Sequence, residues 1–342
     1  MVKEIGSDFP ISLSLFSKKR KNLPKNSILL TSGRDCLAYI LKSLKPTSDV
    51  LLPSYLCPSV LEPFKKLNIK YKFYKVNKNL NIDLTDLKRK IKSKKPTAVL
   101  TINYFGFIQP EINKIKEVCN ENKIILIEDQ VQSFLTKNTP KGDIIFNSYR
   151  KFLPLPDGAF LKGNLKRVKT YPNKTKFSSM RLKAGIMKNL NFPKEYYYER
   201  FKSAEDKLDT HPWPSKMSKT SKKILNKLNL REIVLKRRKN YIFLLKNLKS
   251  KNIKPLYSNL PKEVCPLGFP IISKKRDEVK SKLVESKIYP PVHWILPEKL
   301  DKNKFKDSLE ISNQILTIPI DQRYNLKDMK RVINILNKFN LT

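Results

Sequence analysis

A lysine and an aspartate follow two neighbouring hydrophobic segments of the chain. Asp129 comes after the apolar run 124–127, and Lys151 follows the run 143–146 after a short loop. A lysine at such a junction can be shielded by a sheet and lose its proton, and only the neutral amine attacks a carbonyl group to form a Schiff base. A carboxylate at the carboxyl edge of a parallel sheet lies where open α/β folds bind ligands. The two residues therefore indicate Schiff-base chemistry at one sheet edge.

Neither residue is informative by itself. Acidic residues after strands are common in loops and as helix N-caps, and Lys151 is one of 58 lysines among the 71 basic residues. Ser148 lies on the same turn as Lys151 and could bind a phosphate. The proline-containing segment 152–158 holds the backbone rigid there, which a solvated lysine would not need.

A third candidate segment joins a predicted strand to a predicted helix at Ser32, Gly33 and Arg34. Gly33 allows backbone N–H groups to converge at the start of the helix, where the helix dipole favours an anion. The alternative is that Asp35 is only a first-turn acid favoured by the same dipole. This turn is therefore a weak candidate for a phosphate site.

These segments need a sheet that places them side by side. Short apolar runs alternate with helical patterns through the first 150 residues. This alternation predicts an α/β fold with a mostly parallel sheet covered by helices on both faces. The predicted strands are 27–31, 50–52, 70–76, 98–102, 124–127 and 143–146, and the predicted helices are 33–44, 60–67, 84–91 and 112–118.

The remainder of the chain predicts a second, smaller domain. Segment 163–214 is polar and rich in tyrosine, without a clear period before 196–208, so we expect it to cross the surface or to pack at a subunit interface. Long helices follow, and then an α+β pattern with a strand at 267–272. The expected units are a large α/β domain over 1–214, connecting helices over 215–250 and a small α+β domain over 251–342.

The net charge of +41 would suit a nucleic-acid-binding protein. Proteins that read grooves and clamp phosphates depend on arginine, however, and only 13 of the basic residues are arginines. The lysines are spread singly or in twos and threes, which indicates a composition bias. We therefore do not expect nucleic acid as a partner, although an anionic substrate is compatible with the charge.

Other sequence features concern location and metals. The first ten residues lack a signal-peptide pattern, and no apolar run approaches the length of a bilayer. The four cysteines form no CxxC pair, and two histidines are too few for a His-based metal site. We expect a cytoplasmic protein without a membrane span and without a metal.

Taken together, the motifs resemble those of fold-type-I enzymes that use pyridoxal 5'-phosphate (PLP), and more narrowly the DegT/DnrJ/StrS-type aminotransferases. The resemblance rests on the order of the Gly33 turn, Asp129-x-x-Gln132 and Ser148-x-x-Lys151. It implies a mostly parallel sheet flanked by helices, a small C-terminal α+β domain, and a homodimer with the active site at the subunit interface. Further matching segments are 53–55, 103–106, 142–143 and 157–158.

The resemblance assigns the catalytic roles to Lys151 and Asp129. Lys151 would hold PLP as a Schiff base and then move a proton as general base and acid. Asp129 would pair with the ring nitrogen and keep it protonated, so that the ring acts as an electron sink. Gln132 would contact the ring hydroxyl, and Tyr55 is the candidate for stacking on the ring, although the family position aligns nearer Cys57. The phosphate would be held by Ser148, Ser32, Gly33 and Arg34.

Candidate substrate residues are Tyr104, His293 and Arg323. Arginine is the natural bidentate partner of the α-carboxylate of an amino donor. The alternative, which we favour, is that Arg323 pairs with Asp321 and that the aromatic residues nearby belong to the core.

The reaction implied by the resemblance is ping-pong transamination. An amino acid, glutamate in this family, would donate the amino group to a nucleotide-linked keto sugar, in surface-polysaccharide or amino-sugar biosynthesis. Related proteins that deoxygenate sugars carry a histidine where Lys151 stands, which disfavours that reaction. Two further hypotheses are a PLP-binding protein with another reaction or a regulatory role, and a basic nucleic-acid-binding protein.

Overall fold

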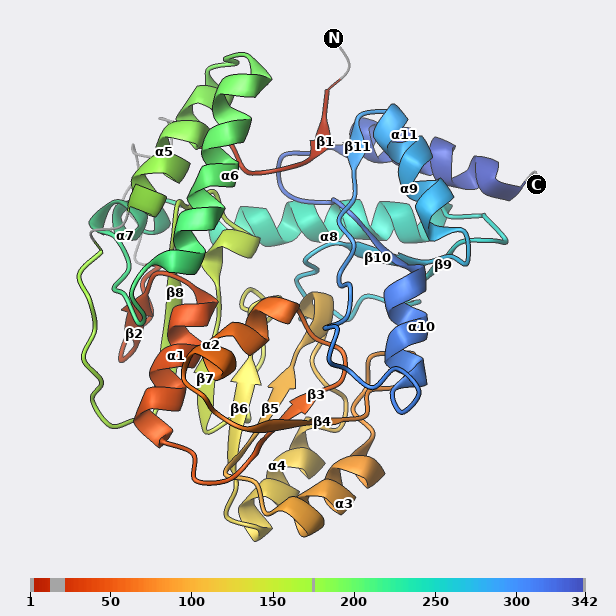
Figure 1. Ribbon diagram of the computed structural model, residues 1–342. Coiled ribbons are helices and arrows are strands. Elements are labelled where there is room, and N and C mark those ends of the chain that lie inside the picture. The colour runs from red at the N-terminus through yellow and green to blue at the C-terminus, as the bar shows by residue number, and fades with distance from the viewer. Residues whose placement is uncertain (1–2, 13–21, 174–175, 341–342) are drawn as a thin grey trace.

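The computed structural model describes residues 3–12, 22–173 and 176–340 (Figure 1). A seven-stranded sheet with the order β2-β8-β7-β6-β5-β3-β4 forms the centre of the large domain. Strands β3 to β7 run parallel, whereas β8 is antiparallel to both β2 and β7. The predicted mostly parallel sheet is therefore confirmed. Its strands are β2 (Ile28–Leu30), β3 (Val50–Pro53), β4 (Tyr71–Tyr74), β5 (Ala98–Ile102), β6 (Ile125–Asp129), β7 (Ile144–Phe146) and β8 (Ala159–Gly163).

Helices cover both faces of this sheet. Right-handed crossovers place α1 and α2 on one face and α3 and α4 on the other, as the strand order requires; Figure 1 shows the two pairs apart. All five residues of β5 are buried, as expected for a strand covered on both sides. The helices are α1 (Gly33–Leu44), α2 (Leu61–Lys66), α3 (Leu84–Lys94) and α4 (Ile112–Glu121).

The segment expected to cross the surface contains a pair of packed helices, α5 (Lys176–Asn189) and α6 (Lys194–Thr210). The sequence indicates α6 from residue 196 onward but does not indicate α5. The buried positions of α5 include Arg181 and Gly185, so this helix has no apolar stripe for a periodicity to reveal. A Cβ at Gly185 would lie 2.7 Å from Ile11 Cγ1, so glycine allows the N-terminal arm to pack directly on α5.

The C-terminal part has the predicted α+β character. Helices α7 (Lys219–Leu225) and α8 (Leu230–Asn247) lead to it. The N-terminal arm, expected with the large domain, joins this part: β1 (Ile5–Gly6) pairs with β11 (Ile288–Tyr289), and Ile5 lies in its core. The remaining elements are β9 (Lys254–Pro255), β10 (Phe269–Ile272), α9 (Arg276–Glu285), α10 (Lys306–Gln314), β12 (Ile315–Ile318), α11 (Leu326–Leu336) and η5 (Asn337–Asn340).

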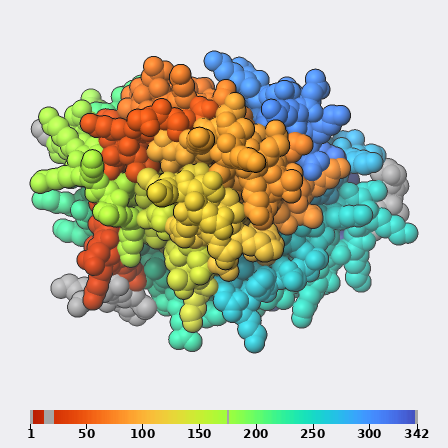
Figure 2. Space-filling model, turned by 90° about the horizontal axis from the view of Figure 1, so that it is seen from below, coloured from red at the N-terminus to blue at the C-terminus, as the bar shows by residue number. Residues whose placement is uncertain are grey.

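The two parts are in direct contact. Phe305, just before α10, and Ile311, within α10, are buried in the hydrophobic core of the large domain. Phe305 packs edge-on against Phe73 of β4 with ring centroids 6.2 Å apart. Figure 2 shows this blue segment against the orange surface of the large domain. Within the described ranges, no helix is both long enough and apolar enough to span a bilayer.

Candidate active site

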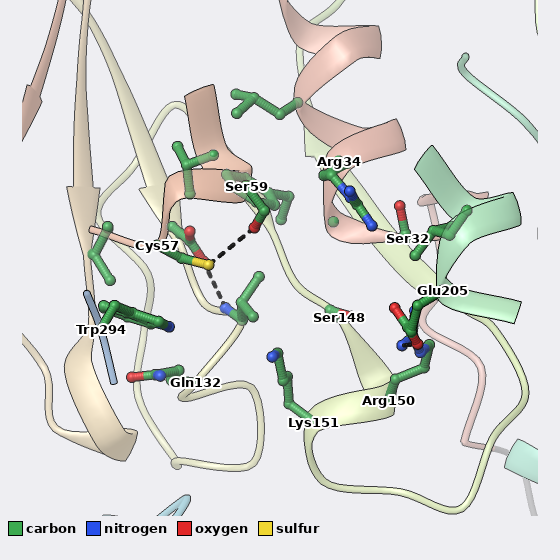
Figure 3. Close-up of a pocket in the computed structure, with 18 of the residues that line it drawn as sticks. Ser32, Arg34, Cys57, Ser59, Gln132, Ser148, Arg150, Lys151, Glu205 and Trp294 are labelled. Carbon is green, nitrogen blue, oxygen red and sulfur yellow. Dashed lines mark hydrogen bonds and ion pairs between the residues drawn. The ribbon is translucent and has the colours of Figure 1, made fainter. Parts of the chain in front are cut away.

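The carboxyl ends of the parallel strands bring the predicted residues together. Asp129 is the last residue of β6 and lies between Ile102 of β5 and Phe146 of β7. Lys151 ends the 3-10 turn η4 (Tyr149–Lys151), which follows β7. A cavity of about 370 Å³ lies at this edge (Figure 3). The predicted residues that line it are Ser32, Gly33, Arg34, Asp129, Gln132, Ser148 and Lys151.

Asp129 is buried at the base of this cavity, with 4% of its surface exposed. The backbone N–H of Val131 donates to its Oδ1 over 2.8 Å. Burial raises the pKa of Asp129 to about 7, although this hydrogen bond and the charge of Lys151 oppose the rise. The carboxyl group is therefore poised to ionise when a cation lies beside it.

The raised pKa of Asp129 predicts a pH-dependent stability for the PLP-free protein. The folded protein keeps this proton up to about pH 7, whereas the unfolded chain loses it near about pH 4, so the group destabilises the fold increasingly between these values. Asp129→Asn lacks this effect. The stability of Asp129→Asn relative to wild type should therefore rise by roughly 2–3 kcal/mol between about pH 5 and about pH 8, which corresponds to a few °C in melting temperature.

Differential scanning fluorimetry across this pH range measures the difference. The matched control is Asp277→Asn on α9, where the carboxylate has 81% of its side chain exposed. A difference between Asp129→Asn and wild type that does not vary with pH would show that the carboxyl titrates alike in the folded and unfolded protein.

Gln132 has an unused donor at the cavity. Its Oε1 accepts the backbone N–H of Phe105 over 2.8 Å, which fixes the amide group. Its Nε2 is buried and finds no acceptor in the part of the chain that the structure describes. A buried donor without an acceptor costs about 1–3 kcal/mol. The Gln132 amide is therefore a ready partner for an oxygen atom of a ligand.

Lys151 projects its amine into the cavity, between Gln132 on one side and Ser148 on the other (Figure 3). The expectation that the sheet shields this side chain is wrong: it is exposed, because η4 carries it beyond the end of β7. The turn itself is held firmly. Tyr149 N donates to Gly158 O over 3.0 Å, and Gly158 N donates to Thr31 O over 2.7 Å.

The start of α1 forms the opposite wall. Ser32 caps the helix: its hydroxyl donates to Asp35 Oδ2 over 2.6 Å and accepts from Asp35 N over 3.2 Å. A Cβ at Gly33 would lie 3.3 Å from Val131 Cγ2, so only a small residue lets this turn approach the loop after β6. The Arg34 guanidinium is already paired with two carboxylates. Backbone N–H groups of the turn are therefore its main contribution to anion binding.

Tyr55 and Tyr104 do not line the cavity. Both are buried behind Trp294, with ring centroids 5.7 and 6.3 Å from the indole. The Tyr55 hydroxyl accepts the Trp294 backbone N–H over 3.0 Å, and the Tyr104 hydroxyl donates to the Tyr55 carbonyl. Trp294 and Cys57 line the cavity instead. The resemblance placed the ring-stacking position nearer Cys57, so the sequence indicated this residue. Trp294, in contrast, was expected in the core.

Lys151 also lines a second, smaller cavity of about 170 Å³ that faces the small domain. His293 lies there, with its Nδ1 2.9 Å from Thr317 Oγ1. Burial, with a contribution from the charge of Lys151, lowers the pKa of His293 to about 3, so its imidazole is neutral. Arg323 lines this cavity but pairs with Asp321 over 2.7 and 2.8 Å, as the interpretation that we favoured predicts.

Arg323 has a further structural role. It donates to the backbone carbonyls of Ser7 and Asp8 over 3.1 Å each, and it lies over the Phe9 ring, 4.4 Å from the centroid. All of these contacts hold the N-terminal arm against the small domain. The guanidinium is thus occupied by the protein itself.

Comparison with known proteins identifies similar chains. Residues 20–142 match the model of the DegT/DnrJ/EryC1/StrS aminotransferase family, so the resemblance indicated by the motifs is confirmed. A putative sugar aminotransferase from Streptococcus pneumoniae, Spr1654 in its PLP form, aligns over 99% of both chains with 12% identity and a TM-score of 0.73. A DegT DnrJ EryC1 StrS aminotransferase from Brucella abortus aligns over 92% of this chain and 86% of its own, with 17% identity and a TM-score of 0.67.

A third similar structure is Helicobacter pylori PseC, an aminotransferase involved in the biosynthesis of pseudoaminic acid. It aligns over 98% of this chain and 99% of its own length, with 12% identity and a TM-score of 0.70. Likeness over nearly the full length at such low identity shows the fold. The predicted fold-type-I arrangement is therefore confirmed.

Proposed function

We propose that this chain, which matches the model of the DegT/DnrJ/EryC1/StrS aminotransferase family, binds PLP at Lys151 and transfers an amino group from glutamate to a nucleotide-linked keto sugar. One observation carries the assignment of the site. The amine of Lys151, the buried carboxyl of Asp129 and the Gln132 amide, whose Nε2 has no acceptor among the described residues, line one cavity at the carboxyl edge of the sheet. These groups match the aldehyde, the ring nitrogen and the ring hydroxyl of PLP in chemical type.

The residues present therefore fit the cofactor, and each has a distinct task. Asp129, when ionised, would hold the proton on the ring nitrogen, and Gln132 would donate its free N–H to the ring oxygen. Bound PLP supplies the electron sink that stabilises negative charge at the substrate carbon. Lys151 would remove the proton from that carbon and return a proton during the same half-reaction, which its flexible, exposed side chain allows.

The second cavity offers a binding place for the substrates. It meets the first cavity at Lys151, so a molecule there would reach the amine from the side of the small domain. The neutral imidazole of His293 offers a hydrogen bond to a sugar hydroxyl, and we assign it that role. We assign Arg323 to the framework of the cavity, because its donors are already used. We also propose, from the family resemblance, a cytoplasmic homodimer.

Glutamate alone should carry the PLP-loaded protein through one half-reaction. We expect L-glutamate to bleach the visible PLP band and to release about one 2-oxoglutarate per site, because the first half of a ping-pong reaction needs no acceptor. Absorbance and an enzymatic 2-oxoglutarate assay measure both events. D-Glutamate is the control. A band that L-glutamate leaves unchanged would rule out glutamate as donor, and a keto sugar that fails to restore the bleached band would rule out that sugar as acceptor.

A further inference from the structure

Two arginines that the sequence did not single out line the larger cavity beside Lys151. Arg150 belongs to η4, between Ser148 and Lys151, and Arg181 belongs to α5. Both guanidinium groups donate to the same carboxylate oxygen, Oε1 of Glu205 on α6 (Figure 3 shows Arg150 with Glu205). We call Arg150 and Arg181 the arginine pair, and Glu205 is the carboxylate that they share.

Aromatic rings fix the positions of this arginine pair. The Arg150 guanidinium lies over Phe177 of α5, 5.0 Å from the ring centroid. The Arg181 guanidinium lies over Phe201 of α6, 5.1 Å from the centroid. Stacking and the shared carboxylate restrict both side chains before any ligand binds, so that little conformational entropy remains to be lost on binding.

The arginine pair has hydrogen-bond donors that its two carboxylates leave unused. Glu205 serves both arginines, and Arg181 has one further carboxylate, Asp8, at 2.7 Å. Arg150 and Arg181 each keep a buried Nε–H that meets no acceptor within the described segments, and Arg181 as a whole is 8% exposed. Burial lowers the pKa of Arg150 to about 10, and the charge of Arg181 adds to the effect. An additional anion would supply the acceptor atoms that these donors lack.

Other anion-binding groups line the same cavity. The start of α1 presents backbone N–H groups at Gly33, and Ser148 presents its hydroxyl group. Ser148, Arg150 and Lys151 are carried within one short segment, so an anion near Ser148 would lie close to the reactive amine. Arg34 lines the cavity too, but its guanidinium already serves Glu62 and Asp209. Arg150 keeps an unused Nε–H and directly precedes Lys151, so it is the arginine best placed for an anion beside the reactive amine.

We propose that Arg150, braced by Arg181 and Glu205, binds the phosphate group of PLP, so that the hairpin formed by α5 and α6 is part of the cofactor site. Phosphate is a dianion with several acceptor oxygens, and a guanidinium with free N–H groups is its strongest side-chain partner. The proposal rests on the proposed function, since it concerns the phosphate of the cofactor that Lys151 would hold. The hairpin lies outside residues 20–142, the segment that matches the family model, and the proposal gives it a role in cofactor binding.

Comparison of PLP with pyridoxal, which lacks the phosphate, tests the proposal. Arg150→Met should raise the dissociation constant for PLP about 10- to 100-fold, the range for loss of a charged hydrogen bond, and should change that for pyridoxal by less than about threefold. Arg150→Lys should recover part of the affinity for PLP, because it restores the charge. Absorbance titration of the PLP-free protein measures the constants of every variant for both ligands.

The matched control is Arg200→Met, which removes an exposed arginine from the same hairpin and should alter neither ligand. If Arg150→Met does not fold, Arg150→Gln keeps the bulk of the side chain and carries the same comparison. Equal weakening of PLP and pyridoxal, or no weakening of either, would overturn the assignment of Arg150. Failure of wild type to attach PLP at Lys151 would instead overturn the proposed function, and the two failures are therefore distinguishable.

Discussion

Replacement of Lys151 by alanine should abolish covalent attachment of PLP and lower the turnover number by at least about 10³-fold, within the range of acid–base catalysis by a positioned group. The large effect follows from the position of the amine, which lines both cavities and thus meets cofactor and substrate. PLP should still bind, more weakly, through Asp129, Gln132 and the phosphate-binding groups. Turnover, absorbance spectra and equilibrium dialysis measure these three effects.

The control for this variant has to account for the many other lysines. Lys72→Ala on β4 removes another exposed lysine, one that lines neither cavity, and it should behave as wild type. Turnover by Lys151→Ala within tenfold of wild type would show that another residue performs the proton transfer.

Replacement of Asp129 by asparagine should lower the turnover number about 10²- to 10³-fold while PLP remains attached to Lys151. The amide occupies the same space but lacks the negative charge that stabilises a protonated ring nitrogen, and loss of one preorganised electrostatic group has costs of this order. Because the site is buried, solvent compensates little for the lost charge. Single-turnover kinetics with L-glutamate measure the effect, since they isolate the first half-reaction.

Asp277→Asn serves again as the control, and the thermal stability of Asp129→Asn excludes misfolding as the cause of any loss. A turnover number within a few-fold of wild type would mean that the Asp129 carboxylate does not act on the ring. Loss of covalent PLP would mean instead that Asp129 is needed to position Lys151.

The part of the site that follows the parallel strands could be predicted from the sequence. Asp129 and Lys151 come after consecutive apolar runs, and parallel strands bring their carboxyl ends to one edge whatever the details of packing. Likewise, β5 and the bounds of α1 agree with the predicted ranges, because a continuous apolar run and a clear helical period mark them.

Residues brought to the cavity by long-range packing could not be predicted. Arg181 reaches the cavity only because α5 and α6 fold back beside η4. The residues of α5 show no hydrophobic period that would indicate a helix. Trp294 comes from the far end of the chain and displaces Tyr55 from the lining. Arg150 stood next to Lys151 in the sequence, but the surplus of basic residues concealed its significance.

The most direct test of a Schiff base at Lys151 is to identify the lysine that PLP modifies. The purified protein is incubated with PLP, reduced with borohydride and digested, and the modified peptide is sequenced by mass spectrometry. We predict one major modified residue, Lys151, despite the 57 competing lysines of the chain. Modification at another lysine, or scattered modification without a visible PLP band, would contradict the assignment of Lys151.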